Sequence, residues 1–192
     1  MKHPLMRSLF CFTLVVATTL TAMAQRHHDP LTEQEIDKIR DASWEPRLRL
    51  PLYVEFARAR LVKLEEVRND PKTKDKAAQT HDLLEGFQQL YDELNDNIDT
   101  YVDRRDDIRK PMKIVIDADT EFQAKLRALK DAADVPRAEA QEYEFVLTNA
   151  LETVDASTED HKKVLADQED LAKRKKLVKD PNAKVGSSPE GK

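Results

Sequence analysis

Residues 84–129 read LEGFQQLYDELNDNIDTYVDRRDDIRKPMKIVIDADTEFQAKLRAL and keep a single heptad register throughout. The positions of this register are Leu84, Tyr91, Ile98, Arg105, Met112, Asp119 and Leu126, with the companion set Phe87, Leu94, Tyr101, Ile108, Val115, Phe122 and Leu129. A seven-residue repeat split four and three aligns these side chains on one stripe of a helix, which must be buried against other helices. The sequence therefore predicts an all-α protein, an elongated antiparallel helical bundle or coiled coil with one long helix.

The predicted core stripe consists of the apolar members of this register. They are Leu84, Phe87, Tyr91, Leu94, Ile98, Tyr101, Ile108, Met112, Val115, Phe122, Leu126 and Leu129. Only Arg105 and Asp119 interrupt the stripe, and buried charges are costly unless they are paired. These two residues are expected to fix register or oligomeric state, to form a polar layer with another helix, or to line a functional groove.

The path of the chain through Pro111 has two solutions. An interior proline removes a backbone hydrogen bond and kinks a helix at a cost of about 3 kcal/mol. The preserved register favours one kinked helix from about residue 73 to residue 133. The alternative is a hairpin in which Pro111 takes the first helical position, where proline is well tolerated.

Prolines also divide the rest of the chain into helical segments. Thr32 and Glu35 fit a capping box that begins a first helix, which has Ile36, Ile39 and Trp44 on its apolar side and ends at Pro46. A second helix is expected from about residue 52 to 68, and a last one from about 138 to 177. No stretch has the alternating pattern of a β-strand.

The first 24 residues have the form of a secretory signal peptide. A basic start with Lys2 and Arg7 precedes a short apolar run, and Ala22-Met23-Ala24 fits a cleavage site, so the cut is expected after Ala24. The expected domains are then the signal peptide at 1–24, a flexible N-terminus at 25–31, one helical bundle at 32–178 and a disordered tail at 179–192. The exported chain is placed in the periplasm, with no transmembrane segment after cleavage.

Composition excludes several kinds of site. Cys11 is the only cysteine and lies in the expected leader, so the exported chain can form neither a disulfide nor a thiolate metal centre. Loss of Lys2 and Arg7 takes the formal net charge from −5 to −7, and so acidic a chain is a poor nucleic-acid binder. No phosphate-binding loop, nucleophile elbow or HExxH motif is present.

Histidines supply the candidate metal ligands. His27 would be third in the exported chain, a position from which an N-terminal amine, two amides and the imidazole can bind copper or nickel, with His28 as a second imidazole. His81 and His161 lie on or beside apolar stripes and lack the Glu-x-x-His partner of di-iron bundles, so both are expected to be buried and hydrogen-bonded. No cofactor is predicted.

Two charged surfaces stand out. The acidic residues Glu85, Asp92, Asp96, Asp99, Asp103 and Asp106 recur every three or four positions on the face opposite the core stripe, as on the solvated side of a bundle helix. The alternative is a calcium-binding or docking surface. Lys173-Arg174-Lys175-Lys176 complements a helix C-terminus or, alternatively, binds an anionic membrane surface or envelope polymer.

Three stretches carry a family resemblance: residues 31–40 (LTEQEIDKIR), residues 81–113, and residues 119–130 (DTEFQAKLRALK). They resemble a group of uncharacterised bacterial exported helical proteins, which implies a helical fold and no particular activity. Leu31-Thr32 is also similar to the LTxxQ motif of periplasmic stress chaperones, although Glu35 stands in place of glutamine and no second copy is present.

These features predict a non-enzymatic exported protein that acts through protein–protein contacts as a scaffold or adaptor. Its partner is unspecified, and self-association is left open. One alternative is a periplasmic holdase chaperone, which requires an exposed apolar concavity. A second alternative is a bundle that binds a metal or small ligand.

Overall fold

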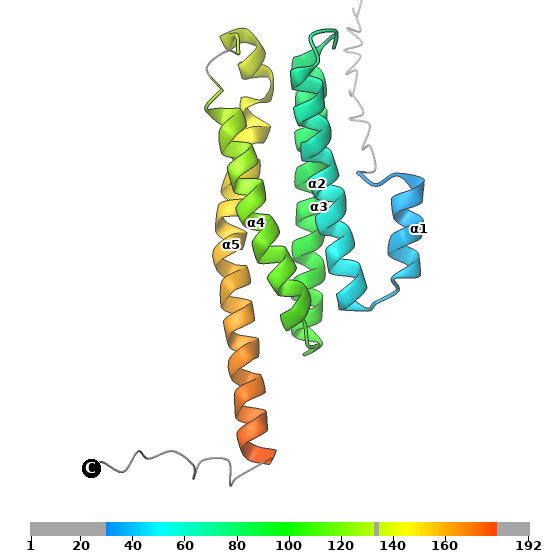
Figure 1. The fold of residues 1–192 in the computed structure, drawn as a ribbon, viewed down its shortest axis with the longest axis vertical. Coiled ribbons are helices and arrows are strands. Elements are labelled where there is room, and N and C mark those ends of the chain that lie inside the picture. Colours follow the sequence, from blue (N-terminus) through cyan, green and yellow to red (C-terminus); the bar gives the residue numbers. More distant parts are fainter. Residues whose placement is uncertain (1–29, 133–134, 180–192) are drawn as a thin grey trace, which may run out of the picture.

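A computed structural model describes residues 30–132 and 135–179, and this part of the chain forms five helices and no strand (Figure 1). The helices are α1 Glu33–Asp41, α2 Pro46–Asn69, α3 Lys76–Asp103, α4 Arg109–Lys130 and α5 Arg137–Lys179. The predicted all-α bundle is confirmed. The expected leader, His27, His28 and the tail from residue 180 lie outside the described residues.

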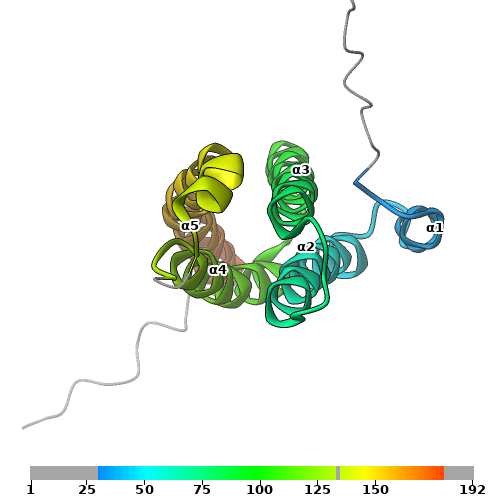
Figure 2. The ribbon, with the colours of Figure 1, turned by 90° about the horizontal axis from the view of Figure 1, so that it is seen from above.

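Four of the helices form an elongated bundle in which successive helices run in alternating directions (Figure 1). Seen end-on, α2, α3, α4 and α5 occupy the corners, and α1 lies outside against α2 (Figure 2). Both α3 and α4 pack against α2 and α5, so α3 and α4 stand at opposite corners. Their side chains meet across the centre, where the rings of Phe87 and Phe122 lie 5.3 Å apart, edge to face.

The start of α1 follows the sequence prediction. The Thr32 hydroxyl accepts a hydrogen bond from the Glu35 amide, and the Glu35 carboxylate accepts one from the Thr32 amide, which confirms the capping box. Ile39 is buried in the core, whereas Trp44, expected on the apolar side, is 58% exposed. The turn that follows α1 places Ser43 in the left-handed region, at φ 50°.

The second helix begins six residues earlier than predicted. Pro46 is its first residue, and the Glu45 side chain caps it by accepting from the Arg47 amide at 3.3 Å. Pro51 therefore lies inside α2 and ends no helix. Pro51 has no amide hydrogen, so α2 lacks one backbone hydrogen bond near its N-terminus. Burial of Pro46 and of Leu50, which is 0% exposed, stabilises these first turns against the core.

The favoured prediction of one kinked helix through Pro111 is wrong. The third helix ends at Asp103, and Arg105 has the left-handed φ of 60°. The Arg105 amide donates to the Val102 carbonyl and the Asp106 amide to the Tyr101 carbonyl, the paired bonds of a Schellman C-cap. The alternative hairpin is nearer the observed path, with Pro111 in the first turn of α4 but as its third residue.

Register is preserved across this break because both helices face one core. All twelve residues of the predicted core stripe are buried, and none is more than 9% exposed. The short linker 104–108 returns the chain to the core at Ile108, which is fully buried, so the heptad spacing continues through a reversal. A preserved register therefore does not distinguish one long helix from two helices that share a core.

No helix within the described residues has an apolar stretch of the length needed to cross a bilayer.

Candidate functional site

A buried polar layer lies at the centre of the bundle. Asp119 of α4 is 0% exposed and accepts a hydrogen bond of 2.8 Å from the Tyr91 hydroxyl of α3. Nδ1 of His161, on α5, lies 2.8 Å from the other carboxylate oxygen of Asp119. One carboxylate therefore joins three helices, and Asp119 forms the polar layer that was one of its expected roles.

The layer continues outward from the histidine. Nε2 of His161 lies 3.1 Å from Oδ1 of Asn95, and Nδ2 of Asn95 donates to the Ser157 hydroxyl at 3.0 Å. Both ring nitrogens thus have partners. Burial raises the pKa of Tyr91, and the charge of Asp119 and the hydrogen bond to it raise this pKa further, so the phenol keeps its proton and remains a donor.

This arrangement has the residue types of a proton relay but little access to solvent. The side chains of His161 and Asp119 are 4% and 0% exposed. The cavities described below share no residue with the layer. Its chemistry fits a role in fixing helix register, because every member depends on the correct alignment of α3, α4 and α5.

Two sequence predictions about charged and histidine residues are wrong. Arg105 is exposed in the α3–α4 linker, because the helix ends before it, and so it neither joins the polar layer nor lines a groove. His81 is half-exposed, with 42% of its side chain accessible, whereas His161 is buried and hydrogen-bonded as predicted.

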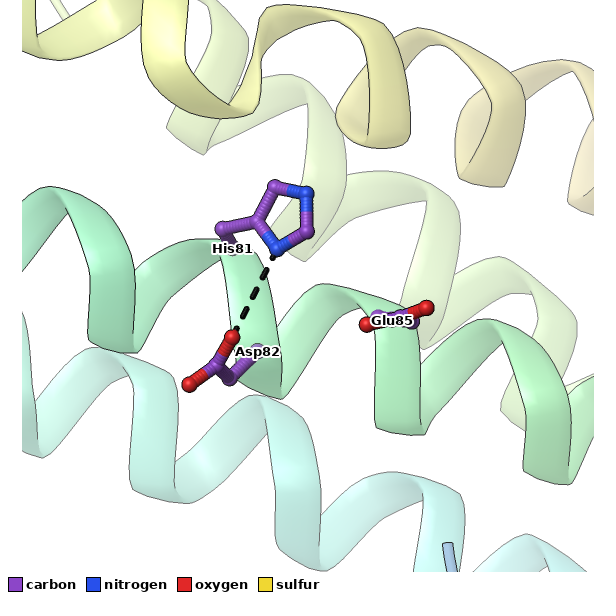
Figure 3. A group of neighbouring side chains, drawn as sticks. All are labelled: His81, Asp82 and Glu85. Carbon is purple, nitrogen blue, oxygen red and sulfur yellow. Dashed lines mark ion pairs between the residues drawn. The ribbon is translucent and has the colours of Figure 1, made fainter. Parts of the chain in front are cut away.

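His81, Asp82 and Glu85 form a candidate metal cluster on α3 (Figure 3). Nδ1 of His81 and Oδ1 of Asp82 face each other at 3.6 Å, and the donor atoms of all three residues lie within 4.8 Å of one another. Asp82 was missed by the sequence prediction, since adjacent residues on a helix point in different directions. A zinc ion 2.0–2.2 Å from each donor would need these exposed side chains to close by about an ångström.

The acidic face of α3 is solvated, as expected. Glu85, Asp92, Asp96, Asp99 and Asp103 are all exposed. Partial burial, followed by the charges of Asp96 and Glu93, raises the pKa of Asp92. Asp106, expected on the same face, is half-buried in the linker, where one carboxylate oxygen lies 3.2 Å from Arg104.

An apolar patch lies at the end of the bundle where α2 begins. Trp44 and Leu48 are 58% and 57% exposed. They border a shallow depression of about 640 Å³ that Arg47 and Arg104 also line. The sequence pattern did not reveal this patch, because Trp44 was assigned to the buried side of the first helix.

The Trp44 side chain is held in place by Arg49. The guanidinium lies 4.8 Å from the centre of the indole ring, in cation–π geometry. Its Nε donates to Oδ1 of Asn97 at 2.8 Å, and one terminal nitrogen donates to the Ser43 carbonyl at 3.1 Å. An arginine that is hydrogen-bonded on two sides thus lies against the ring of an exposed tryptophan.

Apart from an open hollow of about 420 Å³ lined by Asp75, Lys76, Ala77, Ala78, Glu139 and Glu142, two further cavities are small. One groove of about 170 Å³ separates α2 from α4 and is lined by Leu61, Leu64, Leu126 and Leu129, with Arg68 and Lys125 at its margin. A second, of about 240 Å³, lies beside it, where α4 ends and α5 begins. Each is smaller than the 300–1,000 Å³ typical of ligand pockets.

The basic cluster lies in the last turns of α5. Lys173, Arg174, Lys175 and Lys176 are all exposed, and Lys173 makes a surface ion pair of 3.4 Å with Asp170.

No protein-family model matches this chain, and comparisons with curated proteins and with solved structures give no match.

Proposed function

We propose that this chain is an exported, non-enzymatic protein that acts by binding another protein through the patch formed by Trp44 and Leu48. The observation that carries this proposal is an exposed tryptophan that lies against an arginine in cation–π geometry. Tryptophan and arginine are the residue types most enriched at the energetic centres of protein interfaces. Here Arg49 supports the indole, and Arg47 and Arg104 border it.

Rigid support favours binding. An exposed aromatic side chain normally loses rotamer freedom when a partner covers it, and this loss reduces affinity. The bonds from Arg49 to Asn97 and to the Ser43 carbonyl restrict Trp44 before any partner arrives. The patch therefore has the pre-organisation expected of a binding surface.

The absence of catalysis is part of the proposal. The residue types best suited to acid–base chemistry, Asp119 and His161, bond to each other and to neighbouring side chains inside the core. A general base must come within hydrogen-bond reach of its substrate, which their burial opposes. Export remains the expectation from the leader sequence.

The holdase alternative has weaker support. A holdase needs an apolar concavity that accommodates a length of unfolded chain, whereas the apolar groove between α2 and α4 measures about 170 Å³ and the larger depression beside Trp44 is also lined by charged residues. The metal alternative depends on His81, Asp82 and Glu85, which come from a single helix and are half-exposed, in the case of His81, or exposed.

Site-specific photo-cross-linking tests the proposal. A benzophenone amino acid replaces Leu48 in one variant and Ile114 in a control, since Ile114 is also an exposed apolar residue, at 45%, but lies on α4. Both variants are irradiated in the cells that produce the protein. The expected result is a discrete protein adduct from position 48 and none from position 114.

A second substitution ties the adduct to the patch. Trp44→Ala, introduced beside the cross-linker at position 48, is expected to abolish the adduct, whereas Val62→Ala, an exposed apolar truncation elsewhere on α2, leaves it intact. Equal adducts from positions 48 and 114, or an adduct that survives Trp44→Ala, would overturn the proposal.

A further inference from the structure

The fifth helix is longer than the bundle that it helps to form. It contains 43 residues, against 28 in α3 and 22 in α4. The side chain of Gln168 joins α5 to the α3–α4 linker. It accepts a hydrogen bond from the Ile108 amide at 3.1 Å and donates one to the Asp106 carbonyl at 3.0 Å. Beyond this clamp α5 projects past the ends of the other helices (Figure 1).

The projecting end has the opposite charge to the rest of the protein. Residues 171–179 read LAKRKKLVK, with five cations and no acidic residue, in a chain whose formal net charge is −5. A helix C-terminus carries only about half a negative charge, so five cations exceed what the dipole can offset. Neighbouring cations three and four positions apart, such as Lys173 and Lys176, repel each other and weaken the helix.

The apolar residues of this segment lie among the cations. Leu171 and Val178 are seven positions apart and so share one face of α5, at 55% and 81% exposure. Arg174 and Lys175 lie between them, three and four residues after Leu171, and both are exposed. Such a face can place its apolar side chains at the acyl boundary while the long cationic side chains reach the lipid headgroups.

We propose that the projecting end of α5, residues 171–179, binds the surface of a membrane that contains anionic lipids. Charge complementarity carries this assignment. Four of the five cations are lysines, which are depleted from protein interfaces but are attracted as point charges to an anionic lipid surface. This surface is separate from the Trp44–Leu48 patch, so either proposal can fail without the other.

Vesicle sedimentation with the full chain tests the assignment. Wild type is compared on vesicles of phosphatidylcholine alone and on vesicles with about a third phosphatidylglycerol. The expected result is a preference for the anionic vesicles that falls steeply in 0.5 M salt, because screening weakens the attraction. Vesicle binding by residues 1–29 that does not depend on lipid charge would be the same for both vesicles, so the difference between the two vesicles excludes it.

Two matched variants locate the binding surface. The first replaces Lys173, Arg174, Lys175 and Lys176 by glutamine. The control replaces Lys63, Lys72, Lys74 and Lys130, exposed cations that lie elsewhere on the described chain, and so makes the same change in net charge. The first variant is expected to lose the anionic preference by at least about tenfold, since each basic residue near such a surface strengthens binding several-fold. The control keeps the preference.

A third variant examines the apolar contribution. Leu171→Ser with Val178→Ser removes exposed side chains at little risk to folding and is expected to weaken anionic binding a few-fold while its salt dependence persists.

The proposal fails if wild type shows no anionic preference, or if the four-glutamine variant retains it. It also fails if this variant instead abolishes self-association in the absence of lipid, a result that would assign the cations to an acidic protein surface.

Discussion

At the residue scale, two buried tyrosines make the energetics of the polar core testable. Tyr91 donates to Asp119, whereas no described residue provides a hydrogen-bond partner for the equally buried Tyr101 hydroxyl. A buried hydrogen bond to a charged acceptor contributes about 1.5–3 kcal/mol, and an unsatisfied buried hydroxyl costs free energy.

The same substitution should therefore have opposite effects at the two positions. Tyr91→Phe is expected to lower the free energy of unfolding by about 1.5–3 kcal/mol, because it leaves a buried carboxylate short of one donor. Tyr101→Phe should leave it unchanged or raise it by up to about 1 kcal/mol. Urea denaturation measures both, and equal losses at the two positions would show that the bond to Asp119 contributes nothing specific.

The residues of the polar layer were only partly predictable from the sequence. Asp119 was conspicuous because a charge interrupts an apolar stripe, and His161 because it lies on the stripe of the last helix. Their pairing was not predictable, since it depends on α4 and α5 lying side by side, which no local pattern encodes. Arg105 occupies the same heptad position as Asp119 and also interrupts the apolar stripe, but it lies just after the end of α3.

At the element scale, the break between α3 and α4 depends on an arginine in a left-handed conformation. The left-handed conformation costs a residue with a Cβ about 1–2 kcal/mol of conformational free energy, whereas glycine adopts it without this cost. Arg105→Gly is accordingly expected to raise the free energy of unfolding by about 0.5–1 kcal/mol.

The neighbouring residue is the control for this prediction. Arg104 has a right-handed helical backbone, at φ −72°, so Arg104→Gly should destabilise the protein by about 0.5–1 kcal/mol. Thermal denaturation of the two variants measures the difference. A destabilised Arg105→Gly variant would contradict the C-cap and favour the continuous helix.

The attachment of α1 has a definite pH dependence. Burial by itself raises the pKa of Glu35, but hydrogen bonds from Arg60 and from Thr32, together with the charge of Arg60, outweigh burial and hold this pKa below its ordinary value of 4.5. Both carboxylate oxygens bond Arg60, at 2.8 and 2.7 Å, and the side chain is only 12% exposed. Because the folded pKa lies below the unfolded one, the stabilisation is complete above pH 4.5 and disappears as the pH falls through the folded pKa.

Glu35→Gln is thus expected to cost about 1–2 kcal/mol at pH 7 and less at pH 3. Glu33→Gln removes the same charge from the same exposed turn and is the control. Hydrogen exchange of the α1 amides at both pH values reports the docking of this helix. A loss of protection in Glu35→Gln that is the same at both values would argue against the charged pair.

The sequence predicted which segments are helical better than it predicted their ends. The capping box at Thr32 was readable because it depends only on local side chains. The start of α2 was misplaced because burial of Leu50 outweighs the signal of the neighbouring proline, and the end of α3 because two helices that bury one core keep the register of a single long helix. Tertiary burial of this kind cannot be read from a propensity pattern.

At the scale of the whole molecule, the arrangement leaves function to the outside of the bundle. The predicted core stripe and the polar layer are enclosed by helices of one chain. The exposed features include Trp44, the acidic face of α3 and the basic end of α5. Both proposals therefore concern surfaces, and the central claim beneath them is that a single chain completes its own core.

The native mass of the chain from residue 25 onward tests that claim most directly. Light scattering coupled to size exclusion, at two protein concentrations, is expected to give the mass of one chain at both, because the stripe has no apolar surface left to pair. A dimer or trimer that persists on dilution would contradict this result and would mean that the heptad stripe is completed between chains.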